Sequence, residues 1–141
     1  MNRRTSISSS GASDKPQAAA TIEPASCYPY IAKKFDRSVS LLAWGLNEEE
    51  LLEPFLDCAF ALLDAAAVDY EVVFVDDGST DRTPEILASY AAREPRLKVI
   101  RHKQNYNVGI ACRTAIAHAS KEYLFWQTVD WSYDIRKLRV F

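Results

Sequence analysis

The sequence contains few of the features that mark secreted, disulfide-stabilised or membrane-spanning proteins. Its three cysteines are odd in number and lack the spacing of a metal site. Two of them, Cys58 and Cys112, stand in apolar helical stretches, which predicts buried free thiols. No apolar run approaches the length of a transmembrane helix, and the basic N-terminus lacks the apolar core of a secretory signal. We therefore expect a cytoplasmic protein, held at the cytoplasmic face of a membrane only through segments of a longer chain.

An excess of charge of one sign is also missing, since 17 Lys and Arg residues face 19 Asp and Glu residues. This balance excludes a broad basic surface for nucleic acid or for anionic lipid. The 48% of hydrophobic residues in a chain of 141 suits one globular domain. Residues 1–30 are rich in Ser, Ala, Pro and Thr without an apolar period, which predicts a disordered leader before a folded domain over residues 38–141.

The clearest pattern in the chain is an apolar run that stops at two adjacent aspartates. Residues 72–75, VVFV, are typical of a strand covered on both faces of a parallel sheet. Asp76 and Asp77 follow directly, and Gly78 begins a turn. Thr83 is then the expected N-cap of a helix whose first residue is the following proline. The two aspartates should therefore lie at the carboxyl edge of the sheet, where open α/β folds bind ligands, although a plain polar turn explains the same residues.

Further strands and helices follow from hydrophobic periodicity and from proline and glycine positions. We expect strands at residues 38–43, 97–100 and 123–128, and helices at about 54–66, 84–93 and 109–119. The resulting order, β-α-β-α-β-α-β with short links, predicts a parallel sheet with right-handed crossovers, a Rossmann-like α/β fold. Asn47-Glu48, Asp76-Asp77 and Asp130 each follow a strand, so all should reach one edge and form a ligand site there.

The two histidines do not suggest catalysis on this pattern. His102 follows the third predicted strand with no carboxylate near it in sequence, which favours a surface or hydrogen-bonded role. His118 lies late in a predicted helix and should contact the carbonyl groups at its C-terminal end.

Residues 75–81, VDDGSTD, between a strand and a helix, resemble the motif of family 2 glycosyltransferases with the GT-A fold. This family includes polyprenyl-phosphate mannose and glucose synthases, and the resemblance covers roughly residues 38–138. It implies the nucleotide-sugar-binding half of such an enzyme, truncated at its C-terminal side. Within that half it implies that Asp77 contacts the nucleotide base and that Val75 lines the same pocket.

Two other loops resemble the family in part. The first strand of the family usually ends Pro-x-Tyr-Asn-Glu, with Pro, Tyr and Glu near the nucleotide, and here Trp44, Leu46 and Glu48 occupy those places. The third loop of the family reads Asn-Phe-Gly-Lys-Gly-Ala-Ala, and residues 105–111 read NYNVGIA, so that Val108 replaces the lysine.

The fourth predicted strand ends where the family has Asp-x-Asp, the motif that binds a divalent ion bridging the diphosphate. This chain has Asp130, Trp131 and Ser132, which keeps one carboxylate. The resemblance implies Mg²⁺ or Mn²⁺ as cofactor, because a hard ion needs only one or two carboxylates beside phosphate oxygens. Asp134 shares a side with Asp130 in either a strand or a helix and can supply the second carboxylate.

The resemblance implies transfer of a sugar from a nucleotide-diphosphate sugar to a lipid-phosphate or glycan acceptor. We expect the 141 residues alone to be inactive, because the acceptor-binding half of the family is absent. A degenerate, non-catalytic nucleotide-binding domain remains an alternative. A receiver-type signalling domain is a weaker one, because the third predicted strand ends at Arg101 where such a domain needs an aspartate.

Overall fold

The structure is a computed structural model that describes residues 33–130. Its elements in chain order are β1 (Phe35–Gly45), α1 (Leu52–Ala66), β2 (Ala67–Asp76), α2 (Thr83–Arg93), β3 (Leu97–Arg101), α3 (Asn107–His118) and β4 (Tyr123–Trp126). This alternation of strands and helices confirms the predicted order and the α/β class.

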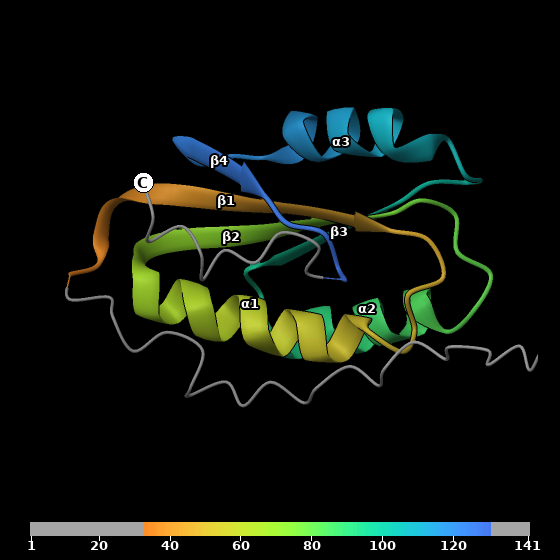
Figure 1. The fold of residues 1–141 in the computed structure, drawn as a ribbon, viewed down its shortest axis with the longest axis horizontal. Coiled ribbons are helices and arrows are strands. Elements are labelled where there is room, and N and C mark those ends of the chain that lie inside the picture. The colour runs from red at the N-terminus through yellow and green to blue at the C-terminus, as the bar shows by residue number, and fades with distance from the viewer. Residues whose placement is uncertain (1–32, 131–141) are drawn as a thin grey trace, which may run out of the picture.

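The four strands form one parallel sheet in the order β3-β2-β1-β4. The chain moves from β1 to β2 to β3 in one direction, then returns to place β4 on the other side of β1. Because parallel crossovers are right-handed, this reversal moves the connecting helix to the opposite face of the sheet. Accordingly α1 and α2 cover one face and α3 covers the other (Figure 1).

Two hydrophobic cores fill the spaces between these layers. The larger one packs α1 and α2 against the sheet and includes Phe55, Leu63, Phe74 and Leu87. The smaller one packs Ala111 and Ala115 of α3 against the other face. In β2 every residue from 70 to 76 is buried, as the continuous apolar run predicts for a strand covered on both faces. The sheet thus holds its carboxyl-end loops on a rigid support.

The start of α2 differs from the prediction. The helix begins at Thr83, with Arg82 in the N-cap position. The Thr83 hydroxyl does not cap its own helix, because it accepts a hydrogen bond from the backbone N–H of Glu48 at 2.9 Å. The Asp81 carboxylate accepts the Thr83 N–H instead, also at 2.9 Å. Thr83 therefore ties the loop after β1 to the loop after β2.

Most other element ends shift by one to three residues from the predicted positions, and β2 begins five residues before the apolar run of residues 72–75, at Ala67. β1 begins three residues earlier, at Phe35, and pairs there with Ala67. β3 extends to Arg101, which pairs with Asp76. α3 begins two residues earlier, at Asn107, and β4 ends two residues earlier, at Trp126. These ends are largely exposed, so the hydrophobic pattern carries little information about them.

The free thiols predicted for Cys58 and Cys112 are confirmed, the first buried and the second half-buried. Cys27 and the predicted leader lie outside the described residues, as do Trp131, Ser132 and Asp134. Between residues 33 and 130, no helix has the length and apolar character needed to cross a membrane.

Candidate functional site

Three strand ends meet at one cavity of about 470 Å³ on the carboxyl edge of the sheet. Glu48 follows β1, Asp77 follows β2 and Asp130 follows β4, and all three line it. The full lining is Trp44, Gly45, Leu46, Glu48, Asp77, Asn105, Asn107, Val108, Gly109, Thr128, Val129 and Asp130. The structure therefore brings together the carboxylates that the strand order placed at this edge.

The cavity opens between the ends of β1 and β4, where the chain reverses its direction across the sheet. Such a switch point leaves a crevice, because the helices on either side of it lie on opposite faces. The first residues of α3, Asn107 to Gly109, form one wall. The Asn107 N–H donates to the Asn105 side-chain oxygen at 2.7 Å. The positive end of the helix dipole still favours an anion, so this wall suits a phosphate.

Not every residue predicted for the site reaches the cavity. Trp44, Leu46, Glu48, Asp77 and Asp130 line it, whereas Val75 is fully buried beneath it in the smaller core. Val75 alternates with Asp76 along β2 and points into the layer under α3, which is why it is inaccessible to a ligand.

Asn47, the residue before Glu48, has a structural role. It adopts a left-handed conformation with φ of 58°. Its side-chain oxygen accepts the backbone N–H of Thr80 at 2.9 Å, and its own N–H donates to the Ser79 hydroxyl at 2.9 Å. Asn47 thus joins the first loop to the second and leaves Glu48 to face the cavity.

Asp77 is held by two donors on one oxygen. Its Oδ1 accepts the backbone N–H of Tyr106 at 3.0 Å and lies 2.7 Å from Nδ1 of His102. The carboxylate is almost fully buried, and its remaining surface lines the cavity. With Oδ1 engaged, Oδ2 is the oxygen left for a ligand.

The neighbouring Asp76 works differently, although the two residues are adjacent. Its Oδ1 accepts the Ser79 N–H at 2.9 Å and so closes the turn. Its Oδ2 lies 3.2 Å from Nε of Arg101 without hydrogen-bond geometry. The Arg101 guanidinium also donates to the Ser79 carbonyl at 3.1 Å. Asp76 is therefore a structural residue, and Asp77 is the residue that faces the cavity.

Gly78 allows the third loop to pack closely against this turn. Its φ of 84° lies in the left-handed region, which side-chain-bearing residues avoid. A Cβ added here would stand 2.5 Å from the carbonyl carbon and 2.7 Å from the Cα of Gln104. The close approach of residues 104–105 brings the next residue, Tyr106, within reach of Asp77.

The carboxylates of the cavity repel one another. Burial raises the pKa of the Glu48 carboxyl above its ordinary value, and the charges of Asp130 and Asp81 raise it further. A cation placed among them would relieve this repulsion. No group of three His, Cys, Asp or Glu residues within 33–130 has the arrangement of a complete metal site. An ion here would need oxygen ligands beyond those that residues 33–130 supply.

His102 is closer to the site than its sequence context suggested. The predicted hydrogen-bonded role is confirmed, and one partner is a carboxylate distant in sequence, because the Asp77 carboxylate contacts the imidazole ring. The reason is register: β2 and β3 are parallel with Asp76 opposite Arg101, so the residues that follow them are neighbours. His118 contacts the Thr114 carbonyl at 2.9 Å, as predicted for a histidine at a helix C-terminus.

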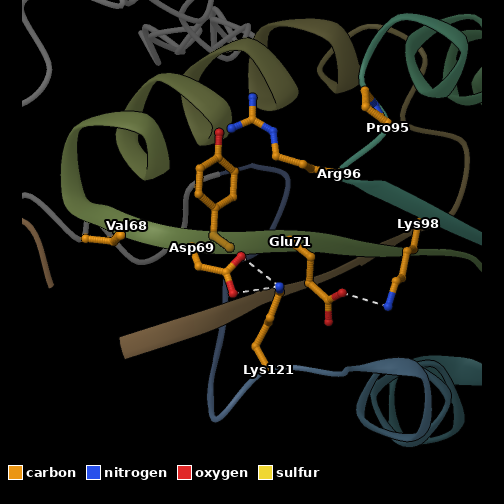
Figure 2. Close-up of a pocket in the computed structure, with 8 residues that line it drawn as sticks. Val68, Asp69, Glu71, Pro95, Arg96, Lys98 and Lys121 are labelled. Carbon is orange, nitrogen blue, oxygen red and sulfur yellow. Dashed lines mark hydrogen bonds and ion pairs between the residues drawn. The ribbon is translucent and has the colours of Figure 1, made fainter. Parts of the chain in front are cut away.

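A second cavity, of about 290 Å³, lies at the opposite edge of the sheet (Figure 2). Its charged side chains neutralise one another: Lys121 binds Asp69 at 2.7 Å, Lys98 binds Glu71 at 2.6 Å, and Arg96 pairs with Glu94 at 2.8 Å. Because these cations already have carboxylate partners, the residues around this cavity serve the fold.

Known proteins resemble this chain in both sequence and structure. The model of the family described as "Glycosyl transferase family 2" matches residues 46–141. A dolichyl-phosphate beta-glucosyltransferase of Trichomonas vaginalis is 29% identical over 108 residues, which are 73% of this chain and 32% of the relative. An undecaprenyl-phosphate 4-deoxy-4-formamido-L-arabinose transferase of Edwardsiella ictaluri is 39% identical over 71 residues, which are 50% of this chain and 22% of the relative.

Solved structures show the same likeness. A mannosyltransferase from Pyrobaculum calidifontis, in complex with GDP-Man and Mn²⁺, has a TM-score of 0.59 and 26% identity over 86% of this chain and 33% of its own. S. aureus TarS with UDP-GlcNAc has a TM-score of 0.58 and 29% identity over 66% of this chain and 26% of its own. The chain thus spans about a third or less of each of these four proteins.

Proposed function

Because the chain belongs to glycosyl transferase family 2, we propose that its described part binds the nucleotide-diphosphate sugar donor of a sugar-transfer reaction. The observation that carries the proposal is the meeting of Glu48, Asp77 and Asp130 at one cavity beside the start of α3. A nucleotide sugar has a base and a ribose that carry hydrogen-bond donors, and a diphosphate that carries negative charge. The cavity offers acceptors on one side and a helix N-terminus on the other.

In this assignment Asp77 accepts hydrogen bonds from the nucleoside, and Trp44 and Leu46 supply apolar contact to it. Glu48 borders the ribose and diphosphate. The N–H groups at the start of α3 face the phosphates. Because this helix start favours negative charge, the site can hold the phosphates with Val108 in the place where the family has a lysine.

A divalent ion, Mg²⁺ or Mn²⁺, fits these residues as a cofactor. Asp130 is the described side chain that would hold it, and its charge adds to burial in raising the pKa of the Glu48 carboxyl. Hard cations take oxygen ligands and complete their shell with phosphate oxygens and water. When bound, such an ion would neutralise charge that develops on the leaving diphosphate. Asp134 is proposed as a second ligand.

We propose a lipid phosphate or a glycan as acceptor, a choice supported by the dolichyl-phosphate and undecaprenyl-phosphate transferases among the relatives. Since the matched part is at most about a third of these relatives, the acceptor site is assigned to no residue described here.

Isothermal titration calorimetry with UDP, GDP and inorganic pyrophosphate, each with and without Mn²⁺, tests the donor site. We expect one nucleoside diphosphate to bind more tightly than pyrophosphate, and more tightly with Mn²⁺ than without it. Equal binding of all three would show that the cavity does not recognise a nucleoside. Sugar turnover by the 141-residue chain would exclude the alternative of a non-catalytic nucleotide-binding domain.

A further inference from the structure

His102 joins the carboxylate of the site to helix α3 through both of its ring nitrogens. Nδ1 lies 2.7 Å from Oδ1 of Asp77, and Nε2 lies 2.9 Å from the hydroxyl oxygen of Thr114. The side chains of His102 and Asp77 are 11% and 7% exposed, so water competes little for these bonds. The imidazole therefore bridges the loop after β2 and the middle of α3.

The chemistry of the partners determines the direction of each bond. A carboxylate oxygen that also accepts the Tyr106 N–H acts only as an acceptor, so Nδ1 of His102 carries the proton in this contact. Nε2 can then accept the hydrogen of the Thr114 hydroxyl. The ring of Tyr106 packs edge-on against the imidazole at 5.2 Å between centroids and limits its movement.

We infer that His102 is a positioning residue that fixes which oxygen of Asp77 faces the nucleoside, an inference that rests on the proposed donor site. Two donors from the loop between β3 and α3, one a side chain and one a backbone N–H, define both the place of Oδ1 and the plane of the carboxylate. With the Tyr106 N–H alone, the group can rotate about its Cβ–Cγ bond. Oδ2 then loses its fixed direction into the cavity.

Two conservative variants separate positioning from packing. The amide nitrogen of asparagine reaches about as far as Nδ1, so His102→Asn keeps a donor for Asp77 and gives up Thr114. The amide of the longer glutamine reaches about as far as Nε2, so His102→Gln keeps a partner for Thr114 and gives up Asp77. Thr114→Val is the matched control, because it removes the distant hydrogen bond and leaves the imidazole in place.

Calorimetry with UDP, GDP and inorganic pyrophosphate, in the presence of Mn²⁺, measures the effect on binding. We expect His102→Gln to bind the preferred nucleoside diphosphate about tenfold more weakly, the loss of one charge-assisted contact, with pyrophosphate affinity unchanged. His102→Asn and Thr114→Val should stay within about threefold of the unaltered chain. Equal losses in the Asn and Gln variants, or a parallel loss for pyrophosphate, would overturn the inference.

A ligand-free measurement decides the question if no nucleoside diphosphate binds and the donor-site proposal itself fails. Hydrogen–deuterium exchange of the Tyr106 backbone N–H, followed by NMR, reports on its bond to Asp77. Exchange should be faster in His102→Gln and stay close to that of the unaltered chain in His102→Asn. Unchanged exchange in both variants would show that His102 does not hold Asp77, whatever the ligand of the cavity.

Discussion

At the scale of single residues, the site depends on the different surroundings of two adjacent aspartates. Asp76 turns its oxygens toward Ser79 and Arg101, and Asp77 turns toward Tyr106, His102 and the cavity. The alternation of a strand end separates the two side chains, so one can stabilise the turn while the other meets a ligand.

The first prediction at this scale concerns Asp77. Asp77→Ala should weaken binding of the preferred nucleoside diphosphate by about 1–3 kcal/mol, because a buried donor of the ligand then has no acceptor. Calorimetry measures the change. Asp36→Ala is the control, since Asp36 is an exposed residue of β1 and its replacement alters the net charge equally. Unaltered affinity in the Asp77 variant would remove that residue from the site.

The second prediction separates two reasons for a glycine at position 78. Asparagine tolerates a positive φ better than alanine does, so conformational preference alone would make Gly78→Asn the milder change. Both side chains bring a Cβ against the backbone of Gln104. We therefore expect both variants to lower the free energy of unfolding by about 1–3 kcal/mol or more. Urea denaturation tests this, and a nearly neutral asparagine variant would show that the third loop is free to move away.

At the scale of elements, one carboxylate connects all parts of the sheet at its amino end. Glu71 of β2 accepts hydrogen bonds from the Ser40 hydroxyl of β1 at 2.7 Å and from the Ser120 N–H, just before β4, at 2.6 Å. It also lies 2.6 Å from Nζ of Lys98 in β3. Burial alone would raise the pKa of Glu71, but its hydrogen bonds with Lys98, Ser40 and Ser120 outweigh burial and lower the pKa to about 2.

This lowered pKa predicts a pH dependence of stability. Because the folded-state pKa lies below the unfolded value of about 4.5, the charged carboxylate stabilises the fold fully above pH 4.5. That contribution, about 3 kcal/mol, is lost as the pH falls from 4.5 to 2. Urea denaturation of the unaltered chain and of Glu71→Gln should therefore show a stability gap that closes over this range.

The control for this prediction is Glu122→Gln, which removes an exposed ion pair with Arg37. Exposed pairs contribute little, so its stability curve should follow that of the unaltered chain. A gap between the chain and Glu71→Gln that is constant from pH 7 to 2 would assign the effect to packing.

The sequence predicted the elements well and the contacts between loops poorly. A hydrophobic pattern reports directly which residues are buried. The apolar run of residues 72–75 and the helical spacing of apolar residues in α1 therefore predicted how the sheet and its helices pack. Asp77 was predicted from its place at a strand end. The contact between His102 and Asp77 depends on the register of β2 and β3, which the order of residues in the sequence does not reveal.

At the scale of the whole molecule, the cavity gathers groups from β1, β2, β4 and α3, so binding of nucleotide and of metal should be linked. We expect Mn²⁺ to bind weakly alone and more tightly with nucleoside diphosphate, which supplies phosphate oxygens. By linkage, Mn²⁺ then strengthens nucleotide binding by the same factor.

Asp130→Asn should abolish this coupling, and Asp134→Asn should only reduce it. Titration of Mn²⁺ with and without UDP or GDP measures the coupling in each variant, with Asp36→Asn as the charge control. Unchanged coupling in Asp130→Asn would show that the ion binds elsewhere.

The strand order also affects the synthesis of the protein. Among residues 33–130, β1 has β2 on one side and β4 on the other, where Trp126 lies opposite Leu42. The residues of β2 are complete at Asp76, 47 positions before those of β4 begin at Tyr123, so β1 can pair with β2 while its other edge is still open. A nascent chain therefore carries the open edge of a central strand for some time, and such edges invite wrong pairing. Limited proteolysis of chains arrested on the ribosome before β4 and after it should show protection of β1 only in the longer ones. Equal protection at both lengths would mean that β1 is shielded before its final neighbour arrives.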